Sequence, residues 1–312
     1  MNKLLLAALV TGALASSAYA ADYTIMAPAS PGGGWDQTAR TMQDALQTEG
    51  ISGNVQVTNV PGAGGTIGLA QFANQDAGNP DALIVGGYVM VGAVLTNQSP
   101  VSLADVTPIA RLTGEADVIV VPANSELQTI DDMVAMLKAN PGSVSWAGGS
   151  AGGVDHIAAG LIAKAVGVDP TAVNYIAYSG GGEALAAVLG GQVTVGISGA
   201  GEFAAQIEAG DLRALAVTGE EPVGDIPTLK DSGIDVVVQN WRMVAAAPGI
   251  TAEQKAAINA DIEKMEKSDS WTTALATKGW VDTYLAGDAF DAQLAKDIES
   301  TSAILKDIGL VQ

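Results

Sequence analysis

The chain has 312 residues, of which 48% are hydrophobic and 15% are charged, and its formal net charge is −20. This composition excludes a disordered chain, and the length suits two domains better than one small core. The excess of acidic residues argues against nucleic acid and anionic membranes as partners, because it repels both. The sequence contains no cysteine, which excludes disulfides and a lipid anchor on a cysteine.

The first twenty residues have the features of a secretory signal peptide. Lys3 supplies the positive start, residues 4–15 form a short apolar run, and residues 18–20 have the small-x-small form of a cleavage site. The apolar run is far shorter than the roughly 20 residues that a membrane-spanning helix needs. We therefore expect residues 1–20 to be a cleaved signal peptide, and the mature chain to begin at Ala21 in the periplasm.

The stretch from Ser30 to Arg40 joins a predicted strand at residues 23–27 to a predicted helix. Apolar residues spaced three and four apart, from Trp35 to Leu46, indicate the helix. Three glycines free the loop backbone, so several N–H groups can face one point, and the helix start adds unpaired N–H groups and partial positive charge. The stretch is either a tight turn that only keeps the chain compact or a cradle for an anion.

The same pattern occurs twice more, and this recurrence favours the anion cradle. Residues 148–153 are rich in glycine and join a strand at 144–146 to a helix. Residues 179–182 likewise join a strand at 174–178 to a helix. Because each loop opens a helix, we expect three helix N-termini to point at one shared ligand.

The remaining segments alternate between short apolar strands and helices. Such alternation predicts an α/β fold with parallel sheets, helices on both faces, and ligands beyond the carboxyl ends of the strands. The loop at 61–65 resembles a dinucleotide fingerprint, but Ile67 stands where the third glycine is required, so no nucleotide site is predicted. Further strands are predicted at 54–60, 82–86, 108–112, 118–122, 193–197, 213–218 and 240–246, and further helices at 66–74 and 88–95, from Thr129, from Thr251 and along 290–308.

We expect two lobes, because two predicted strands lie where the chain would pass from one sheet to the other. One lobe comprises residues 21–121 and 245–312, and the other comprises residues 122–244. The crossings are the strands near 118–122 and 240–246, and two crossings make a hinge. The glycine loops would then line the cleft between the lobes.

Five segments together resemble one known family. They are PGGGWDQTAR at 31–40, NVPGAGGTIG at 59–68, LAVT at 215–218, IPTL at 226–229 and WRMVAAAP at 241–248. In this order they are similar to the TctC or Bug-type family, which are the extracytoplasmic solute receptors of tripartite tricarboxylate transporters. The resemblance covers nearly the whole mature chain.

The resemblance implies a two-lobed type II periplasmic binding fold, each lobe a mainly parallel sheet flanked by helices. Such a receptor captures a small organic acid and delivers it to the membrane subunits of the transporter. The Trp-Asp-Gln form of residues 35–37, together with residues 89–92 and Asn97, is closest to the tricarboxylate branch, so a tricarboxylate such as citrate is the expected ligand. Residues 241–243 depart from many members, which affects the ligand that fits. We expect a monomer without cofactor or metal.

In the family, the three glycine loops hold the ligand, largely through backbone N–H groups and waters. Tyr178 and Ser179 can add hydroxyl donors. Arg242 can grip a carboxylate with its planar fork, or it can form an ordinary salt bridge. The expected ligand-binding residues are Ser30, Gly32, Gly33, Gly34, Trp35, Asp36, Ser150, Ala151, Gly152, Gly153, His156, Tyr178, Ser179, Gly180, Gly181 and Arg242.

Asp36 has two possible roles at the start of its helix. An acid in the first turn is favoured by the helix dipole, and Arg40 follows four residues later in the favourable acid-then-base order. The pair either only stabilises the helix start or also orders the loop, with a contact to the ligand through water.

Two other functions fit parts of the sequence. Residues 148–152 satisfy G-x-S-x-G between a strand and a helix, the nucleophile elbow of hydrolases, which would make Ser150 the nucleophile of an esterase. The only histidine, His156, lies on the helix that the serine opens, where its ring is not expected to reach the serine, so we expect no enzyme. With Asp155 alone beside it, His156 is poor evidence for a metal site. A sensory receptor of the same fold for a dicarboxylate or other organic acid stays open.

Overall fold

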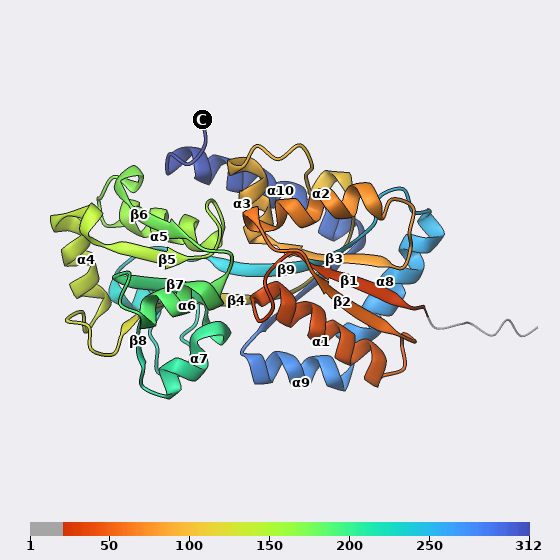
Figure 1. Cartoon of the computed structure of the whole chain (residues 1–312), viewed down its shortest axis with the longest axis horizontal. Helices are drawn as coiled ribbons and strands as arrows, with labels where there is room; N and C mark the ends of the chain where they lie inside the picture. The colour runs from red at the N-terminus through yellow and green to blue at the C-terminus, as the bar shows by residue number, and fades with distance from the viewer. Residues whose placement is uncertain (1–20) are drawn as a thin grey trace, which may run out of the picture.

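The computed structural model describes residues 21–312, so the predicted signal peptide lies outside the described residues. Two groups of strands and helices lie side by side and share one mixed sheet that runs through both (Figure 1). We call the group at the start of the chain the first lobe and the other the second lobe. The prediction of an α/β fold is confirmed.

Three parallel strands from the start of the chain form the edge of the first lobe. Its outermost strands pair in the order β2-β1-β3, and every residue of β3 is buried, as in a strand that is covered on both faces. Each strand leads into a helix, which returns the chain to the same edge of the sheet. The elements are β1 (Tyr23–Ala27), α1 (Gly34–Thr48), β2 (Val55–Asn59), α2 (Thr66–Gln75), β3 (Ala82–Gly87) and α3 (Tyr88–Thr96).

One long strand, β4 (Thr107–Pro122), stands where the sequence predicted two short strands at 108–112 and 118–122. The prediction broke the strand because the residues between these segments are polar. In the structure they continue the strand, since β9 (Gln239–Ala246) pairs with them and Glu115 is buried against a cation. The first half of β4 thus belongs to the sheet of the first lobe, and its second half belongs to the sheet of the second lobe.

The second lobe combines parallel strands with antiparallel partners of β4. β5 lies between β6 and β7 in parallel, whereas β7 and β8 both pair with β4 in the antiparallel direction. The capping box predicted at Thr129 is confirmed, because its hydroxyl accepts the N–H of Asp132 and the Asp132 carboxylate accepts the N–H of Thr129. The elements are α4 (Ile130–Ala139), β5 (Ser145–Gly148), α5 (Val154–Ala165), β6 (Asn174–Ala177), α6 (Gly181–Leu189), β7 (Val195–Gly199), α7 (Ala200–Glu208) and β8 (Leu212–Val217).

The chain returns to the first lobe through β9, which is antiparallel to both β3 and β4. A mainly parallel sheet was predicted. The outer strands of each lobe are parallel, but the central strands are antiparallel because β4 leaves the first lobe and β9 comes back. The capping box predicted at Thr251 is confirmed, whereas α7, α9 and β10 were not predicted. The last elements are α8 (Ala252–Glu266), α9 (Asp269–Lys278), β10 (Val281–Ala286) and α10 (Gly287–Asp307).

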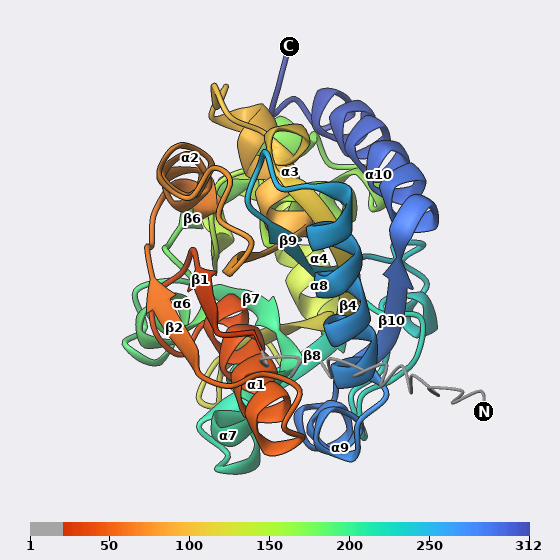
Figure 2. The same ribbon diagram turned by 90° about the vertical axis from the view of Figure 1, so that its right-hand side faces the viewer.

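Helices cover both faces of the sheet in the first lobe. Figure 2 shows α2, α3 and α10 above the strands and α1 and α9 below them. One apolar core joins these helices to the strands of this lobe, and two further cores lie on opposite faces of the second-lobe sheet. The end of α10 reaches the second lobe, where Leu305 and Ile308 pack with Ile157 of α5. The C-terminal helix therefore connects the lobes in addition to the two strands.

We propose the division into lobes that the sequence predicted, at 21–121 plus 245–312 and at 122–244. The strand pairing supports two crossings at the predicted strands. It would move both boundaries toward the N-terminus, because residues 117–122 pair with the second-lobe strands and β9 pairs with the first-lobe strands.

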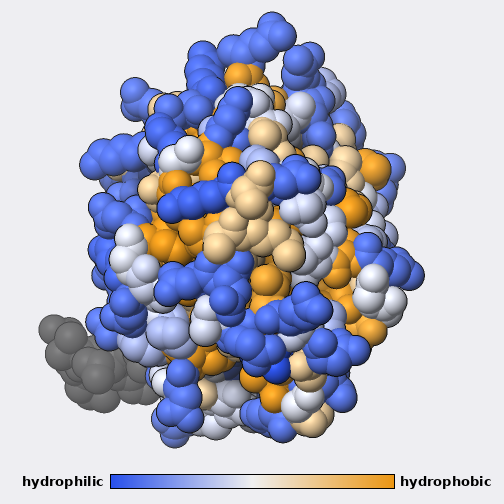
Figure 3. Space-filling view, turned by 90° about the vertical axis from the view of Figure 1, so that its left-hand side faces the viewer, coloured by the Kyte–Doolittle hydropathy of each residue, from blue (hydrophilic) through white to orange (hydrophobic). Residues whose placement is uncertain are grey.

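The surface is largely polar. Figure 3 shows the end of the molecule that carries α4 and β6, with polar side chains spread across it between apolar ones. Among residues 21–312, no helix is long and apolar enough to cross a bilayer.

Candidate ligand-binding site

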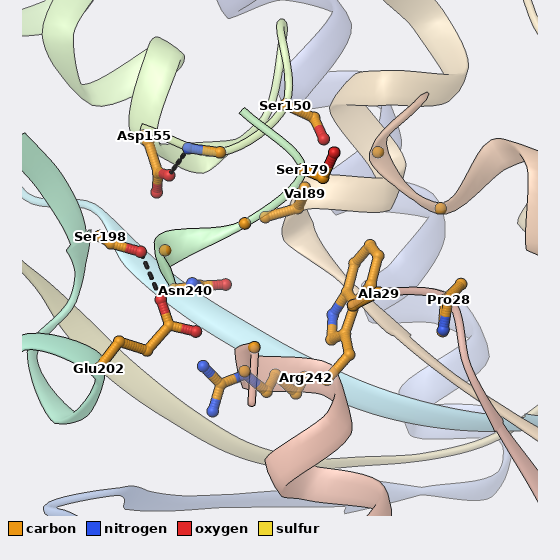
Figure 4. Close-up of a pocket in the computed structure, with 18 of the residues that line it drawn as sticks. Pro28, Ala29, Val89, Ser150, Asp155, Ser179, Ser198, Glu202, Asn240 and Arg242 are labelled. Carbon is orange, nitrogen blue, oxygen red and sulfur yellow. Dashed lines mark hydrogen bonds between the residues drawn. The ribbon is translucent and has the colours of Figure 1, made fainter. Parts of the chain in front are cut away.

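A cavity opens between the two lobes, where strands end and helices begin (Figure 4). The junctions β1–α1, β2–α2, β5–α5, β6–α6 and β7–α7 all contribute to its wall, together with α3 and β9. Its volume is about 70 Å³, which is enough for several waters or a small molecule. It is lined by Pro28, Ala29, Gly33, Gly34, Trp35, Gly62, Gly64, Gly65, Val89, Gly149, Ser150, Asp155, Ser179, Gly180, Gly181, Ser198, Glu202, Asn240 and Arg242.

The cavity brings together predicted residues from all three glycine loops and from β9. The predicted residues in its lining are Gly33, Gly34, Trp35, Ser150, Ser179, Gly180, Gly181 and Arg242. The others lie behind the loops or in a neighbouring groove. They are Ser30, Gly32, Asp36, Ala151, Gly152, Gly153, His156 and Tyr178.

Three helices start at this cavity with a glycine as their N-cap residue. These residues are Gly33 for α1, Gly153 for α5 and Gly180 for α6. Glycine has no side chain, so none of these N-cap residues caps its own helix, although the carboxylate of Glu202 accepts the N–H of Gly34 at the start of α1. Unpaired N–H groups and the positive end of the helix dipole attract an anion, so this part of the wall is suited to a carboxylate.

Asp36 orders the first loop. Its carboxylate accepts the N–H of Gly32 at 2.8 Å, the amide of Asn59 at 2.9 Å and Nε of Arg40 at 3.0 Å. Burial opposes ionisation, but these hydrogen bonds together hold the pKa of Asp36 below its usual value. Asp36 is therefore a charged group that fixes the loop, and its contact with the ligand through water stays a prediction.

Part of the second loop joins the lobes to each other. A Cβ on Gly152, whose φ is +75°, would meet the side chain of Thr96 on α3. Thr96 Oγ1 also donates to the carbonyl of Ala151 at 3.2 Å. Since α3 belongs to the first lobe and the loop to the second, these contacts hold the two lobes together.

His156 is a packed side chain behind the second loop. Its Nδ1 accepts the N–H of Gly152 at 3.2 Å, and its ring stacks on Tyr175 with 4.1 Å between centroids. Burial lowers the pKa of His156 to about 4, so the imidazole is neutral at physiological pH. These contacts occupy the ring and leave Ser150 at the cavity wall, which fits a binding role of the serine better than a catalytic pair.

The third loop borders both the cavity and a groove beside it. The N–H of Ser179 donates to the Glu183 carboxylate at 3.1 Å, which fixes the loop at the start of α6. Tyr178 faces the neighbouring groove, which Ala63 and Asn97 line from the first lobe. Tyr178 therefore lies beside the cavity and does not line it.

Arg242 forms the ion pair that was one of its two predicted roles, and its grip on a ligand carboxylate stays a prediction. Its Nη2 forms an ion pair with Glu115 of β4, and its guanidinium lies 5.0 Å from the ring centroid of Trp280. Its Nη1 is buried and has no partner among the described residues, although the side chain is only 3% exposed and lines the cavity. Burial lowers the pKa of Arg242 to about 9, so it stays charged at neutral pH.

Sequence reasoning missed the acidic side of the cavity. Asp155 and Glu202 line it, and Asp117 lies behind them with no solvent exposure. Burial raises the pKa of Asp155 to about 7, and burial also raises those of Asp117 and Glu202. Ser198 lies near the end of β7 and its hydrogen-bond partner Glu202 lies in the first turn of α7, and this position at the end of a strand was the available signal.

The loop between β2 and α2 is the other missed part of the wall. Gly64 and Gly65 have φ of +62° and +84°, and Cβ atoms there would meet Ser150 and Trp35 respectively. The sequence showed that this loop fails a nucleotide fingerprint, and no other role was assigned to it. Its position after a strand would have placed it at the cavity.

The fold and the cavity define a two-lobed solute-binding protein. The family described as tripartite tricarboxylate transporter family receptor matches residues 38–310, so the chain belongs to this family. It is 27% identical over 292 residues to Protein BugT of Bordetella pertussis, and this alignment covers 91% of this chain and 88% of BugT. The members of this family are periplasmic binding proteins, and this chain is a binding protein rather than an enzyme.

Solved structures agree with the fold. The periplasmic binding protein BugD is 21% identical and gives a TM-score of 0.84 over 93% of this chain and 98% of BugD. MatC from Rhodopseudomonas palustris, solved with bound malate, is 22% identical and gives a TM-score of 0.77 over 92% of this chain and 98% of MatC. The predicted Bug-type family and two-lobed fold are thereby confirmed.

Proposed function

We propose that this chain is a periplasmic receptor that captures a small organic acid in the cavity between its lobes. We further propose that it delivers this acid to the membrane subunits of a tripartite tricarboxylate transporter. The family supports receptor function, and MatC, a structural neighbour, carries malate. The predicted signal peptide at residues 1–20 supports export to the periplasm.

The observation that carries this proposal is the convergence of three helix starts with glycine N-caps and one buried arginine on one cavity. Each helix start contributes roughly 0.3–1 kcal/mol toward an anion, and up to about 2 kcal/mol where it is partly buried. Arg242 adds an N–H group that lacks a partner among the described residues. A carboxylate would satisfy these donors together.

The cavity lies between lobes that two strands connect, so we propose that the lobes rotate apart for the ligand to enter. β4 and β9 would act as the hinge. The hydrogen bond between Thr96 and Ala151 joins the two lobes and would break when they rotate apart. The hydrogen bond between Asn97 and Ala63 would stay intact, because both residues belong to the first lobe. A ligand held by both lobes would favour the closed arrangement.

The finer prediction from the sequence is a tricarboxylate such as citrate, and it stays a prediction. A thermal-shift screen of the mature chain with citrate, malate, succinate and L-amino acids tests the proposed function. A ligand at 100 times its dissociation constant should add about 2.7 kcal/mol to the free energy of unfolding. If no acid in the screen raises the melting temperature, the proposed function is wrong.

Two neighbouring glycines of α6 provide a matched pair of variants. A Cβ on Gly181 would meet Glu202 and Ser198 at the cavity, whereas a Cβ on Gly182 would meet nothing within 4 Å. Gly181→Ala should lower the affinity for the ligand at least about 10-fold, because the cavity loses space and its wall shifts. Gly182→Ala should bind like the unmodified chain in calorimetry, and equal affinities of both variants would place the ligand elsewhere.

A further inference from the structure

The cavity has an acidic side that a purely anionic ligand would have to face. Asp155 and Glu202 line this side, and Asp117 lies directly behind them. The nearest cation, Arg242, is already paired with Glu115. Three acids thus lie at or behind the wall of the cavity, and a fourth already pairs with its arginine, so a ligand with two or three carboxylates would meet repulsion that this arginine cannot cancel.

The floor of the cavity nevertheless offers one strong anion donor. Nη1 of Arg242 lacks a partner among residues 21–312, and its side chain is 3% exposed and lines the cavity. A buried guanidinium N–H without a partner is costly, and a ligand carboxylate would satisfy it with a charge-assisted hydrogen bond. The cavity therefore has a place for one carboxylate.

The three sides of the cavity differ in chemistry. Figure 4 shows Asp155, Ser198 and Glu202 on one side, Arg242 and Asn240 at the floor, and Pro28 and Ala29 on the opposite side. The lining also includes the apolar side chains of Trp35 and Val89. The side with Asp155 and Glu202 therefore offers negatively charged hydrogen-bond acceptors, and the floor offers the cation Arg242. The opposite side offers an apolar surface.

We propose that the ligand is a zwitterionic α-amino acid with an uncharged side chain. Its carboxylate lies on Arg242 and the helix starts, its ammonium group lies on Glu202 and Asp155, and its side chain lies against Pro28 and Ala29. An α-amino acid carries these three groups on one carbon, which matches the three sides of the cavity. The inference rests on the proposed function, because it concerns the same cavity, and it replaces citrate as the expected ligand.

The ionisable groups around the ammonium position decide how binding depends on pH. Burial raises the pKa of Asp155 on α5 to about 7, and burial also raises those of Glu202 on α7 and Asp117 on β4. The other groups that face them keep their charge state between pH 6 and 8. They are His156 with a pKa of about 4, Tyr175 with a raised pKa, and Arg242 with a pKa of about 9, ion-paired to Glu115.

An ammonium group binds best when these acids are ionised. The affinity for an amino acid should therefore rise as the pH rises through about 7. A ligand that carries only carboxylates should show the opposite trend, because protonation of the acids removes the repulsion. The sign of the pH dependence thus separates the two classes of ligand.

Calorimetry on the mature chain at pH 6, 7 and 8 tests the inference. The probes are L-alanine and L-leucine, their counterparts without the amino group, propionate and 4-methylpentanoate, and citrate and malate. We expect an amino acid to bind more tightly than its counterpart, and to bind more tightly at pH 8 than at pH 6. This comparison needs no variant, so it does not depend on the folding of one.

A pair of variants on α7 tests whether Glu202 holds the ammonium group. Glu202→Gln keeps the size of the side chain but removes its charge, and it should lower the affinity for the amino acid about 10- to 150-fold. The same variant should leave the affinity for the deaminated acid unchanged or increase it. Glu208→Gln, on the exposed end of the same helix, should bind both ligands like the unmodified chain.

The outcomes separate the inference from the proposed function. If citrate or malate binds more tightly than either amino acid, and more tightly at pH 6 than at pH 8, the inference is wrong and the proposed function stands. If Glu202→Gln weakens both classes of ligand equally, Glu202 does not hold the ammonium group and the inference is wrong. If none of the six probes binds, both proposals are overturned.

Discussion

Two acids stand at matching positions in the two lobes and have opposite charge behaviour. Asp36 and Asp155 each lie in the first turn of a helix that follows a glycine loop, and they are 3% and 5% exposed. Each accepts an N–H from its own loop, at 2.8 Å from Gly32 and at 2.5 Å from Gly149. The local structure around the two carboxylates is thus nearly the same.

The difference between them comes from distant parts of the chain. β2 brings Asn59 to Asp36, and Arg40 adds a cation, so the pKa of Asp36 is lowered. Burial and the charge of Glu202 on α7 instead raise the pKa of Asp155 to about 7, although hydrogen bonds with Gly149 and with Asp117 of β4 lower it. One local motif therefore gives a fixed anion in the first lobe and a group that titrates near neutrality in the second.

The largest effect should come from removing the cation that the acidic side shares. Arg242→Ala leaves Glu115 buried at 2% exposure without its partner, and breaking such a pair costs roughly 3–5 kcal/mol. Urea unfolding should show this loss, and adding Glu115→Gln should recover part of it. A loss under about 1 kcal/mol would mean that water reaches Glu115.

Asp155→Asn should remove a fall in stability that the unmodified chain shows as the pH rises. The folded pKa of about 7 lies above the unfolded value of about 3.8, so Asp155 stabilises the fold at low pH and loses this contribution as the pH rises through about 7. The difference in the free energy of unfolding between the variant and the unmodified chain should change by about 1 kcal/mol for each pH unit between these two pKa values. Urea unfolding at pH 5, 6 and 7 checks it, and a constant difference would contradict it.

Asp36→Asn should show the opposite sign. The lowered pKa means that the contribution of Asp36 is present above the unfolded value and is lost as the pH falls through the folded value. At pH 7 the variant should lose about 1–2 kcal/mol, because hydrogen bonds to a charged group are replaced by neutral ones. Urea unfolding should show this loss at pH 7 and a smaller one near pH 3; an equal loss at both would assign it to packing.

Arg40→Gln should have the smallest effect. The Arg40 side chain is 50% exposed, and exposed ion pairs contribute roughly 0.2–1 kcal/mol. Urea unfolding at pH 7 should therefore show a loss under about 1 kcal/mol, which shrinks further in 1 M salt. A larger loss would mean that Arg40 holds the loop by itself, and Asn59 would then contribute little.

Residues close together in the sequence determined much of this protein. The strand, glycine loop and helix at residues 23–48, the capping boxes at Thr129 and Thr251, and the other two glycine loops all follow from short-range rules of spacing and capping. Since strands in such folds present their carboxyl ends at one edge, the sequence also predicted that glycine loops meet at a shared site. Eight of the predicted residues, which are named above, line the cavity, and their contact with a ligand stays a prediction.

Only the tertiary structure decided the continuity of β4 and the charge of the site. Residues 113–117 are too polar to predict a strand, and they form one because β9 pairs along residues 113–116, β7 pairs at Asp117, and Arg242 neutralises Glu115. Asp117, Asp155 and Glu202 lie far apart in the sequence, and no local rule shows that they meet. A pKa depends on burial and on the charges within a few ångströms, and both are set by the packing of distant segments.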